Sequence, residues 1–340
     1  MKNIVVISLV ALVFSASPTL ADEEIGIFET ILQSSVSFAE TNQALEEAIA
    51  ASALQLHATH VVRVPDDAHQ AKVYVLTSPA YVEAAAAESP RTVSGLILRI
   101  AVFTSGDEQK TFVNMANPES HAMVYFSESS SYDELIGAAN TAAEEIRQLV
   151  TAIPGTAVSV QGEPMRKEKK YRKFNGDGPA KMMAKFRNWE ESQLPLIEDS
   201  ADNFEVVVEQ VVTRLGEGTI SDAEETTGWE IVSQIRLRDD VVHIGLTNPY
   251  IEDRMIRINS RYRDEGKSEL SPLPGVDHVA ALPTEVLIVK DGEQTLVVHY
   301  GQMWRMQLYF WDSGYRAFTV NVGVPDDIVD SIEEAVQPAR

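Results

Sequence analysis

The clearest hydrophobic pattern in this chain is a helical stripe in the first half. Ser131 and Glu134 stand at capping-box spacing before the stripe, and Ile153-Pro154-Gly155 ends it. The apolar residues recur every three or four positions and therefore lie on one helix face: Leu135, Ala139, Ala142, Ile146 and Leu149. The pattern predicts a helix from about 131 to 150 whose apolar face is core.

Two stretches have the pattern of a β-hairpin, in which apolar runs flank a tight turn. In the first, residues 95–103 and 111–115 surround Ser105-Gly106-Asp107. In the second, residues 285–289 and 295–300 surround Asp291-Gly292. A Gly-containing turn between apolar runs is a strong local hairpin signal. Both stretches are therefore predicted to be antiparallel strand pairs.

A short motif occurs twice. Leu76-Thr77-Ser78-Pro79 returns as Leu246-Thr247-Asn248-Pro249, and a predicted hairpin follows each copy. Self-similarity of this kind predicts repeated structural units, and two copies are too few for a solenoid. We therefore expect two tandem, related α+β domains, each a mainly antiparallel sheet backed by helices.

Other segments are harder to assign from their pattern. Residues 122–126, 204–212, 303–311 and 315–322 are predicted strands because they are rich in β-branched and aromatic residues. A short helix is expected near 221–227. A final helix is predicted after Pro325, with Ile328, Ile332 and Val336 on one face.

The domain boundaries follow from the two copies. The first domain is predicted over 22–155 and the second over 204–340, with residues 156–203 as a basic linker or insert. The second copy is about fifteen residues longer, with the extra residues near 268–283. We expect any binding site to lie in this longer copy.

Residues 1–21 have the composition of a secretory signal peptide. Lys2 precedes an apolar run from Ile4 to Phe14, and Thr19-Leu20-Ala21 is a plausible small-residue cleavage site. The run is too short to span a bilayer, which takes roughly twenty apolar residues. We therefore expect a periplasmic protein that is not inserted in the membrane after cleavage.

Composition excludes several kinds of function. The chain has no cysteine, so disulfides, thiolate metal sites and thiol catalysis are excluded. A net charge of −23 disfavours nucleic acid as a partner. Against this charge, residues 166–173 contain six basic residues and continue into a basic stretch that reaches 187. That segment either binds an anion or docks on acidic protein surface, and we favour docking.

The second copy resembles a known bacterial family. Gly245-Leu246-Thr247-Asn248-Pro249, a predicted helix, Leu282-Pro283 before a strand, then a hairpin and a C-terminal helix are similar to the domain of unknown function 302 family. The resemblance covers roughly 204–336 and, with fewer matches, 25–150. It implies a compact α+β fold and no known activity. Many members carry cysteines where Thr247 and Thr284 stand here, so their possible metal or redox chemistry does not transfer.

The histidines are the main candidates for metal binding. His57 and His60 lie three apart on a predicted strand and point to opposite faces. His243 and His299 lie on different predicted strands and could meet, with Met303 nearby in the sequence. A histidine and methionine set suits copper. Phosphate-loop, nucleophile-elbow and zinc-protease motifs are absent from the sequence.

These observations predict a non-enzymatic accessory or binding protein whose partner is an unknown small molecule or protein. No cofactor, metal or catalytic residue is assigned. The alternative is a copper-like metal carrier or enzyme that uses His243, His299 and Met303. The expected ligand or partner surface lies in the second domain and combines aromatic rings with polar tips. Its residues are Asn248, Arg254, His299, Tyr300 and Trp304.

Overall fold

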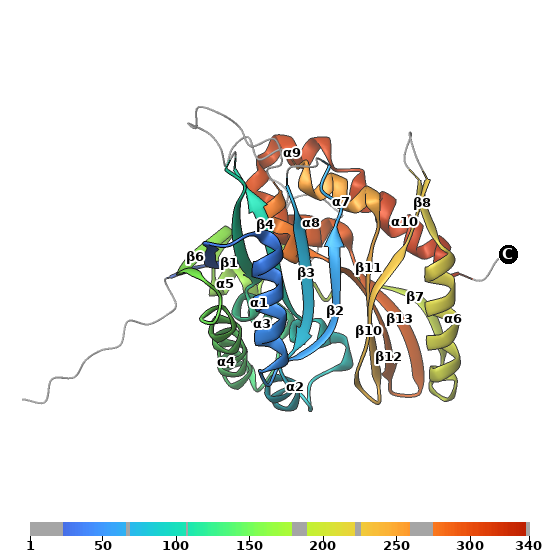
Figure 1. Ribbon diagram of the computed structural model, residues 1–340. Coiled ribbons are helices and arrows are strands. Elements are labelled where there is room, and N and C mark those ends of the chain that lie inside the picture. Colours follow the sequence, from blue (N-terminus) through green and yellow to red (C-terminus); the bar gives the residue numbers. More distant parts are fainter. Residues whose placement is uncertain are drawn as a thin grey trace, which may run out of the picture.

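Two antiparallel sheets with helices around them form the protein (Figure 1). The computed structural model describes residues 23–65, 69–106, 108–178, 189–221, 226–258 and 275–337. The predicted fold class, α+β with antiparallel sheets backed by helices, is confirmed. The predicted signal peptide lies outside the described residues. Within the described ranges, no helix is long and apolar enough to cross a lipid bilayer.

Sheet A has the strand order β2-β3-β4-β5-β1-β6, and every neighbouring pair is antiparallel. Its strands are β1 Glu24–Ser34, β2 Gln55–Val62, β3 Ala71–Thr77, β4 Leu98–Ser105, β5 Lys110–Ala116 and β6 Gly155–Lys167. Sheet B has the order β10-β11-β12-β13-β7, also antiparallel. Its strands are β7 Gln193–Ser200, β10 Glu230–Arg238, β11 Val241–Thr247, β12 Thr284–Asp291 and β13 Gln294–Tyr300.

The helices fall into two consecutive halves of the chain, as the strands do. The first half, with sheet A, contains α1 Phe38–Ala50, α2 Pro79–Ala84, the 3-10 helix η2 Pro90–Leu96, α3 Pro118–Tyr125, α4 Tyr132–Val150 and α5 Glu168–Arg172. The second half, with sheet B, contains η4 Ala201–Asn203, α6 Phe204–Glu217, α7 Pro249–Ile256, η5 Val276–Ala281, α8 Gln302–Phe310, η6 Trp311–Ser313, α9 Gly314–Val320 and α10 Val324–Val336. A small hairpin, β8 Thr219–Ser221 and β9 Thr226–Gly228, follows α6.

The two halves share one order of elements. In the first half the order is β1, α1, β2, β3, α2, η2, β4-β5, α3 and α4. In the second half the matching order is β7, α6, β10, β11, α7, η5, β12-β13, α8 and α10. The first five strands of sheet A also have the order of the five strands of sheet B. Pro79 is the first residue of α2, which follows β3, and Pro249 is the first residue of α7, which follows the matching strand β11. Internal duplication, as an account of how the chain arose, remains a prediction.

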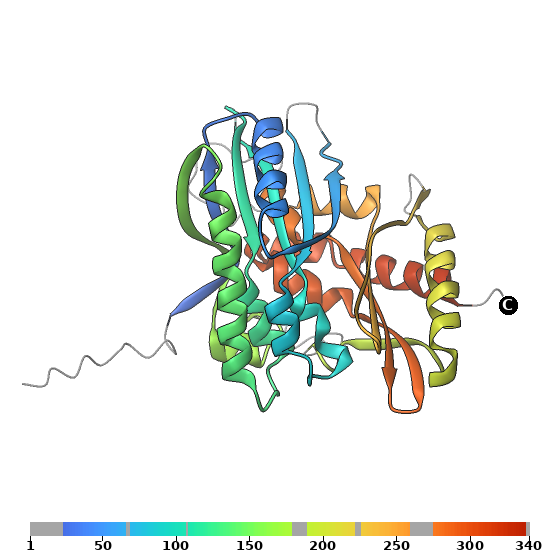
Figure 2. The ribbon, with the colours of Figure 1, turned by 60° about the horizontal axis from the view of Figure 1, so that its bottom comes forward.

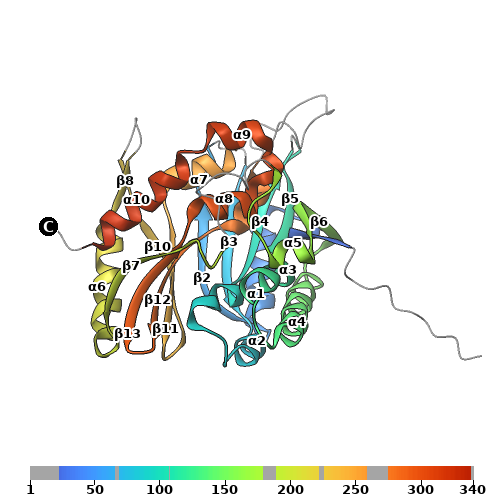
Figure 3. The ribbon, with the colours of Figure 1, turned by 180° about the vertical axis from the view of Figure 1, so that it is seen from behind.

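The halves pack together around one continuous hydrophobic core. Helix η2 of the first half lies against β12 of the second half, and η5 of the second half lies against β4 of the first. The edge strands β2 and β10 also contact each other. Helices α1 and α4 cover sheet A on the outside, and α6 lies at the far end, beside sheet B (Figure 2). Helix α8 lies near the centre of the molecule (Figure 3). The middle strands are buried on both faces, so they read as continuous apolar runs.

Several strand predictions were wrong. Residues 122–126 belong largely to α3, 204–212 to α6, 303–311 to α8 and 315–322 largely to α9. In α6 the valines and Leu215 are buried at helical spacing, so packing outweighs their preference for strands. The helix predicted near 221–227 falls partly outside the described residues, and residues 226–228 form strand β9.

The predicted insert, residues 156–203, is not a separate segment. Residues 155–167 form β6 and pair with β1, while β7 pairs with β13 at the edge of sheet B. The second half therefore begins at β7, before the predicted boundary at residue 204. The repeat motif could not reveal this because both strands gain their partners from distant parts of the chain.

Candidate functional site

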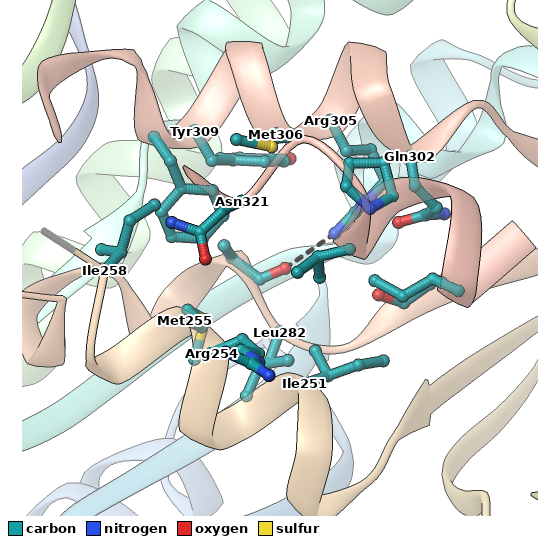
Figure 4. A pocket seen from close by; sticks show the side chains of 16 residues that line it. Ile251, Arg254, Met255, Ile258, Leu282, Gln302, Arg305, Met306, Tyr309 and Asn321 are labelled. Atoms are coloured by element: carbon teal, nitrogen blue, oxygen red, sulfur yellow. Dashed lines mark hydrogen bonds between the residues drawn. The ribbon is translucent and has the colours of Figure 1, made fainter. Parts of the chain in front are cut away.

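A pocket opens between α7 and α8, with the start of α10 at one side (Figure 4). Its volume is about 80 Å³, and it is partly open to solvent. The lining is predominantly apolar. A concave, apolar site with a few polar groups is the usual form of a small-molecule pocket.

Helix α7 supplies one wall, and its local sequence sets where it begins. The Asn248 side chain accepts a hydrogen bond of 2.8 Å from the backbone N–H of Ile251, and Pro249 occupies the first turn. From this start, Ile251, Arg254 and Met255 fall at helical spacing on the face that lines the pocket. Arg254 is exposed, and its guanidinium lies over the Tyr250 ring at 5.2 Å.

Helix α8 supplies the opposite wall through residues at positions i, i+3, i+4 and i+7. Gln302, Arg305, Met306 and Tyr309 all line the pocket (Figure 4). These positions share one helix face, so α8 alone supplies four lining side chains, three of which carry a polar group. Val324, Pro325 and Ile328 of α10 close the side.

Arg305 is held in place by several contacts. It is 6% exposed. Its Nη1 donates to Glu285 Oε2, and its Nη2 donates to the carbonyl oxygen of Ala281 at 2.9 Å. The guanidinium also lies over the Tyr309 ring at 5.2 Å. These contacts fix the guanidinium in place at the pocket wall.

A buried polar network continues from the pocket into the first half. Arg99 Nη2 donates to the Tyr309 hydroxyl at 2.7 Å, and His121 Nε2 lies 2.8 Å from the same oxygen. Arg99 Nη1 donates to the Ala281 carbonyl at 3.2 Å and lies 4.0 Å from Glu285 Oε1. Burial, with the charge of Arg99, lowers the pKa of His121 to about 3. The imidazole is therefore neutral at ordinary pH.

One further polar contact joins the halves away from the pocket, and a buried histidine of η5 meets the first half through its ring. Glu252, fully buried on α7, lies 2.6 Å from His60 Nε2 and accepts the backbone N–H of Arg63 at 2.7 Å. His278 lies 2.7 Å from Asp277 and 3.1 Å from Asp312. Burial lowers the pKa of His278, but the charges of Asp312 and Asp277 outweigh burial and raise it to about 9. Its ring meets Phe28 of β1 edge-on at 5.0 Å.

The residues of the predicted surface do not gather on an accessible face. Arg254 lines the pocket, but Asn248, His299, Tyr300 and Trp304 are buried. Asn248 caps α7, and the Tyr300 hydroxyl donates to the Arg91 carbonyl at 2.8 Å. The aromatic rings at 300 and 304 pack 5.9 Å apart in the core. The side chains of Tyr300 and Trp304 thus contribute to the packing between the halves.

The predicted metal set does not come together. His243 is opposite Leu287 of β12, whereas His299 is opposite Val286. Neighbouring residues on one strand point to opposite faces, so the two histidines do too. Met303 lies on α8, in a segment that was predicted to be a strand. It packs beside Phe318 of α9 in a small separate hydrophobic cluster. Among the described residues, no group of three or more suitable side chains could hold a metal ion.

The polar network was missed at the sequence level. A charged residue inside an apolar strand run is the signal that could have found it: Arg99 within β4 and Glu285 within β12. The two occupy matching positions, since Arg99 pairs with Val75 and Glu285 pairs with Gly245, the counterpart of Val75. Only the packing of the halves shows that they approach each other.

The basic segment docks on protein surface in part. Arg166 is buried, binds Asp177 at 2.6 Å and donates to the carbonyl oxygens of Gln307 and Leu308 near the end of α8. Arg172 lies over the Tyr132 ring at 4.1 Å. The stretch from 179 to 188 lies outside the described residues. Where described, the segment thus contacts both halves.

Comparisons with known proteins add no relative. No protein-family model, no curated protein and no solved structure matches this chain. The resemblance to the domain of unknown function 302 family therefore stays a prediction.

Proposed function

We propose that this chain is a non-enzymatic binding protein that holds a small, largely apolar ligand between α7 and α8. The observation that carries the proposal is the pocket itself, with its apolar lining and few fixed polar groups. The pocket lies in the second half, where a site was expected. The predicted signal peptide at residues 1–21 makes the periplasm its expected location.

The chemistry of the lining supports binding over catalysis. Among the described residues that line the pocket, none is a histidine, a serine or a carboxylate, and Thr284 supplies a hydroxyl group without a histidine beside it in the lining. Proton transfer and nucleophilic attack usually depend on such groups. The Tyr309 hydroxyl, which is a candidate acid, is already bound by Arg99 and lies next to His121. This arrangement suits recognition of a shape and a polar group.

The size of the pocket limits the ligand. A cavity of roughly 150 Å³ accommodates a benzene molecule, and this pocket has about 80 Å³. Because the pocket is partly open, part of the ligand can remain outside. A narrow aliphatic chain therefore fits better than an aromatic ring.

The test uses two eight-carbon probes, octanoate and octan-1-ol, with binding measured by isothermal titration calorimetry. Val324→Trp places a large ring at the pocket side and is expected to abolish binding of both. Val320→Trp is the matched control, since Val320 is 77% exposed and does not line the pocket. Failure of both probes to bind the unaltered chain, or unchanged binding by Val324→Trp, would overturn the proposal.

The matching order of elements also supports an origin by internal duplication, which we include in the proposal. On that account the ligand site belongs to one copy only. The other copy serves as a partner that buries the back of the site through Arg99 and His121.

A further inference from the structure

The charges around the pocket differ from those of the whole protein. The chain has 51 acidic and 28 basic residues. Among the described lining residues there are two arginines, Arg254 and Arg305, and no carboxylate. The nearby Asp327 of α10 accepts the Tyr250 hydroxyl at 2.7 Å and is not part of the lining. The charged side chains that line the described pocket are thus both cationic, on a strongly acidic protein.

Arg305 has donors to spare. Its guanidinium carries five N–H groups. Its Nη1 donates one to Glu285, and its Nη2 points to the carbonyl oxygens of Ala281 and Pro283 at 2.9 and 3.5 Å. The Nε–H and the second Nη1–H have no acceptor among the described residues. An anion in the pocket would supply one.

The buried network around Arg305 also carries excess positive charge. Arg99 and Arg305 contribute two positive charges, and Glu285 contributes one negative charge, all at most 6% exposed. Burial is the main cause that lowers the pKa of His121 to about 3 and of His243 to about 4, so both are neutral. Asp277 and the buried Asp312 pair with His278, at 2.7 and 3.1 Å, and form a separate charged group with that histidine. A buried charge without a partner is unfavourable, and an anion beside it relieves this cost.

Together these observations define the ligand class, on the assumption that the proposed binding function holds. We infer that the pocket binds an aliphatic carboxylate, with its anionic head near Arg305 and Gln302 and its chain toward Met255 and Ile258. Figure 4 shows Gln302 and Arg305 at one end of the pocket and Ile258 at the other. A net charge of −23 repels an anionic membrane surface, so the carboxylate is a free acid.

The two eight-carbon probes separate this inference from the proposed function. Octanoate and octan-1-ol have the same chain and differ in head-group charge. We expect the unaltered protein to bind octanoate about tenfold more tightly, as one charge-assisted hydrogen bond allows. Equal affinities would overturn the carboxylate inference and leave the binding function standing. Binding of neither probe would overturn the binding function.

Three variants locate the positive charge that matters. Arg305→Gln should reduce octanoate affinity to that of octan-1-ol, with folding checked by circular dichroism. Arg254→Gln changes an exposed side chain and should lower octanoate affinity severalfold while leaving octan-1-ol unchanged. Arg257→Gln is the matched control, because Arg257 is exposed at the C-terminal end of α7, pairs with Asp253 and does not line the pocket.

The outcomes decide between a local and a general charge effect. If Arg305→Gln does not fold, the comparison of Arg254→Gln with Arg257→Gln decides. Equal losses in these two variants would show a general effect of net charge and would overturn the inference. A loss confined to Arg254→Gln would support it.

Discussion

The two halves have the same strand order, yet only the second has this pocket among the described residues. In the first half, residues 126–131 join α3 to α4, and α4 packs on both α2 and α3. In the second half, residues 311–323, which include η6 and α9, separate α8 from α10. Helix α10 therefore leaves space where α4 fills it. The longer connection between the two helices thus accompanies the pocket of the second half.

The side chains at matching positions show the same difference. Tyr81 of α2 is fully buried and meets Phe126 edge-on at 6.3 Å. Its counterpart, Ile251 of α7, is smaller and lines the pocket. The first half thus fills with an aromatic ring the space that the second half leaves open.

Matching positions near the contact between the halves carry different charges. Arg99 of β4 corresponds to Glu285 of β12, and His121 of α3 corresponds to Arg305 of α8. When two halves with the same strand order face each other, identical charges at such positions would repel. Opposite charges attract, so the difference between the halves itself stabilises their contact.

The largest expected effect tests this charge relation. Glu285→Leu removes the carboxylate that, among the described residues, pairs with Arg99 and Arg305, and should lower the free energy of unfolding by about 3–5 kcal/mol. The double variant Glu285→Leu with Arg305→Leu should be less destabilised, because one buried charge is removed with its partner. Urea unfolding followed by circular dichroism measures both. A loss below about 1 kcal/mol in the single variant would contradict this account.

The pH dependence of stability is the next largest effect. The folded pKa of His278 is about 9 against 6.5 for the free side chain, so its contribution is complete below pH 6.5 and is lost as pH rises through 9. That contribution is about 3 kcal/mol. Burial lowers the pKa of His243 and of His299 to about 4, so stability also falls below pH 6.5.

Unfolding measured from pH 4 to 10 should therefore give a maximum near pH 6.5. In His278→Gln the decline between pH 6.5 and 9 should disappear, while the acidic decline stays. A Gln variant that keeps the alkaline decline would show that another group causes it. His243→Leu is the complementary control, since it should weaken only the acidic decline.

A reciprocal exchange tests the filled and the open sites. Tyr81→Ile makes the first half like the second and should lower the free energy of unfolding by roughly 2–3 kcal/mol, because it leaves a cavity in a packed core. Ile251→Tyr should change stability less, because the ring enters existing space, and should abolish binding of octanoate. If Ile251→Tyr proves the more damaging of the two, the comparison between the halves is wrong.

The smallest effect concerns the segment of the first half that has no counterpart in the second. Lys170 lies 3.4 Å from Asp177, and Arg172 lies 3.9 Å from Glu168. Changing both to Gln should lower stability by at most about 1 kcal/mol, and by less at high salt, which screens exposed pairs. Lys169→Gln, at an exposed position, is the control and should have no effect. A larger loss at high salt would exclude ion pairing as the cause.

Local patterns predicted much of the secondary structure. The α4 stripe and both hairpins were confirmed because their signals depend on residues close together in the sequence. Helices α6, α8 and α9 were predicted as strands because valines and aromatic residues favour strands in isolation. Packing of one buried face decides such segments, and composition does not contain that information.

The site was less predictable than the fold. Arg254 was the only member of the predicted surface that lines the pocket. Tyr300 and Trp304 were chosen for aromatic and polar chemistry, which is equally suited to a core between two halves. Whether His243 and His299 lie on the same face of the sheet depends on the register of β12 between their strands, which the sequence does not reveal.

The sequence by itself determined the fold class, the repeated strand-to-helix motif, the cysteine-free chemistry and the strong negative charge. These follow from composition and from contacts between near neighbours. The tertiary structure alone decided that Arg99 meets Glu285, that β6 and β7 complete the two sheets, and that a pocket remains between α7, α8 and the start of α10. These depend on how distant segments pack, and packing is settled by burial and register over the whole chain.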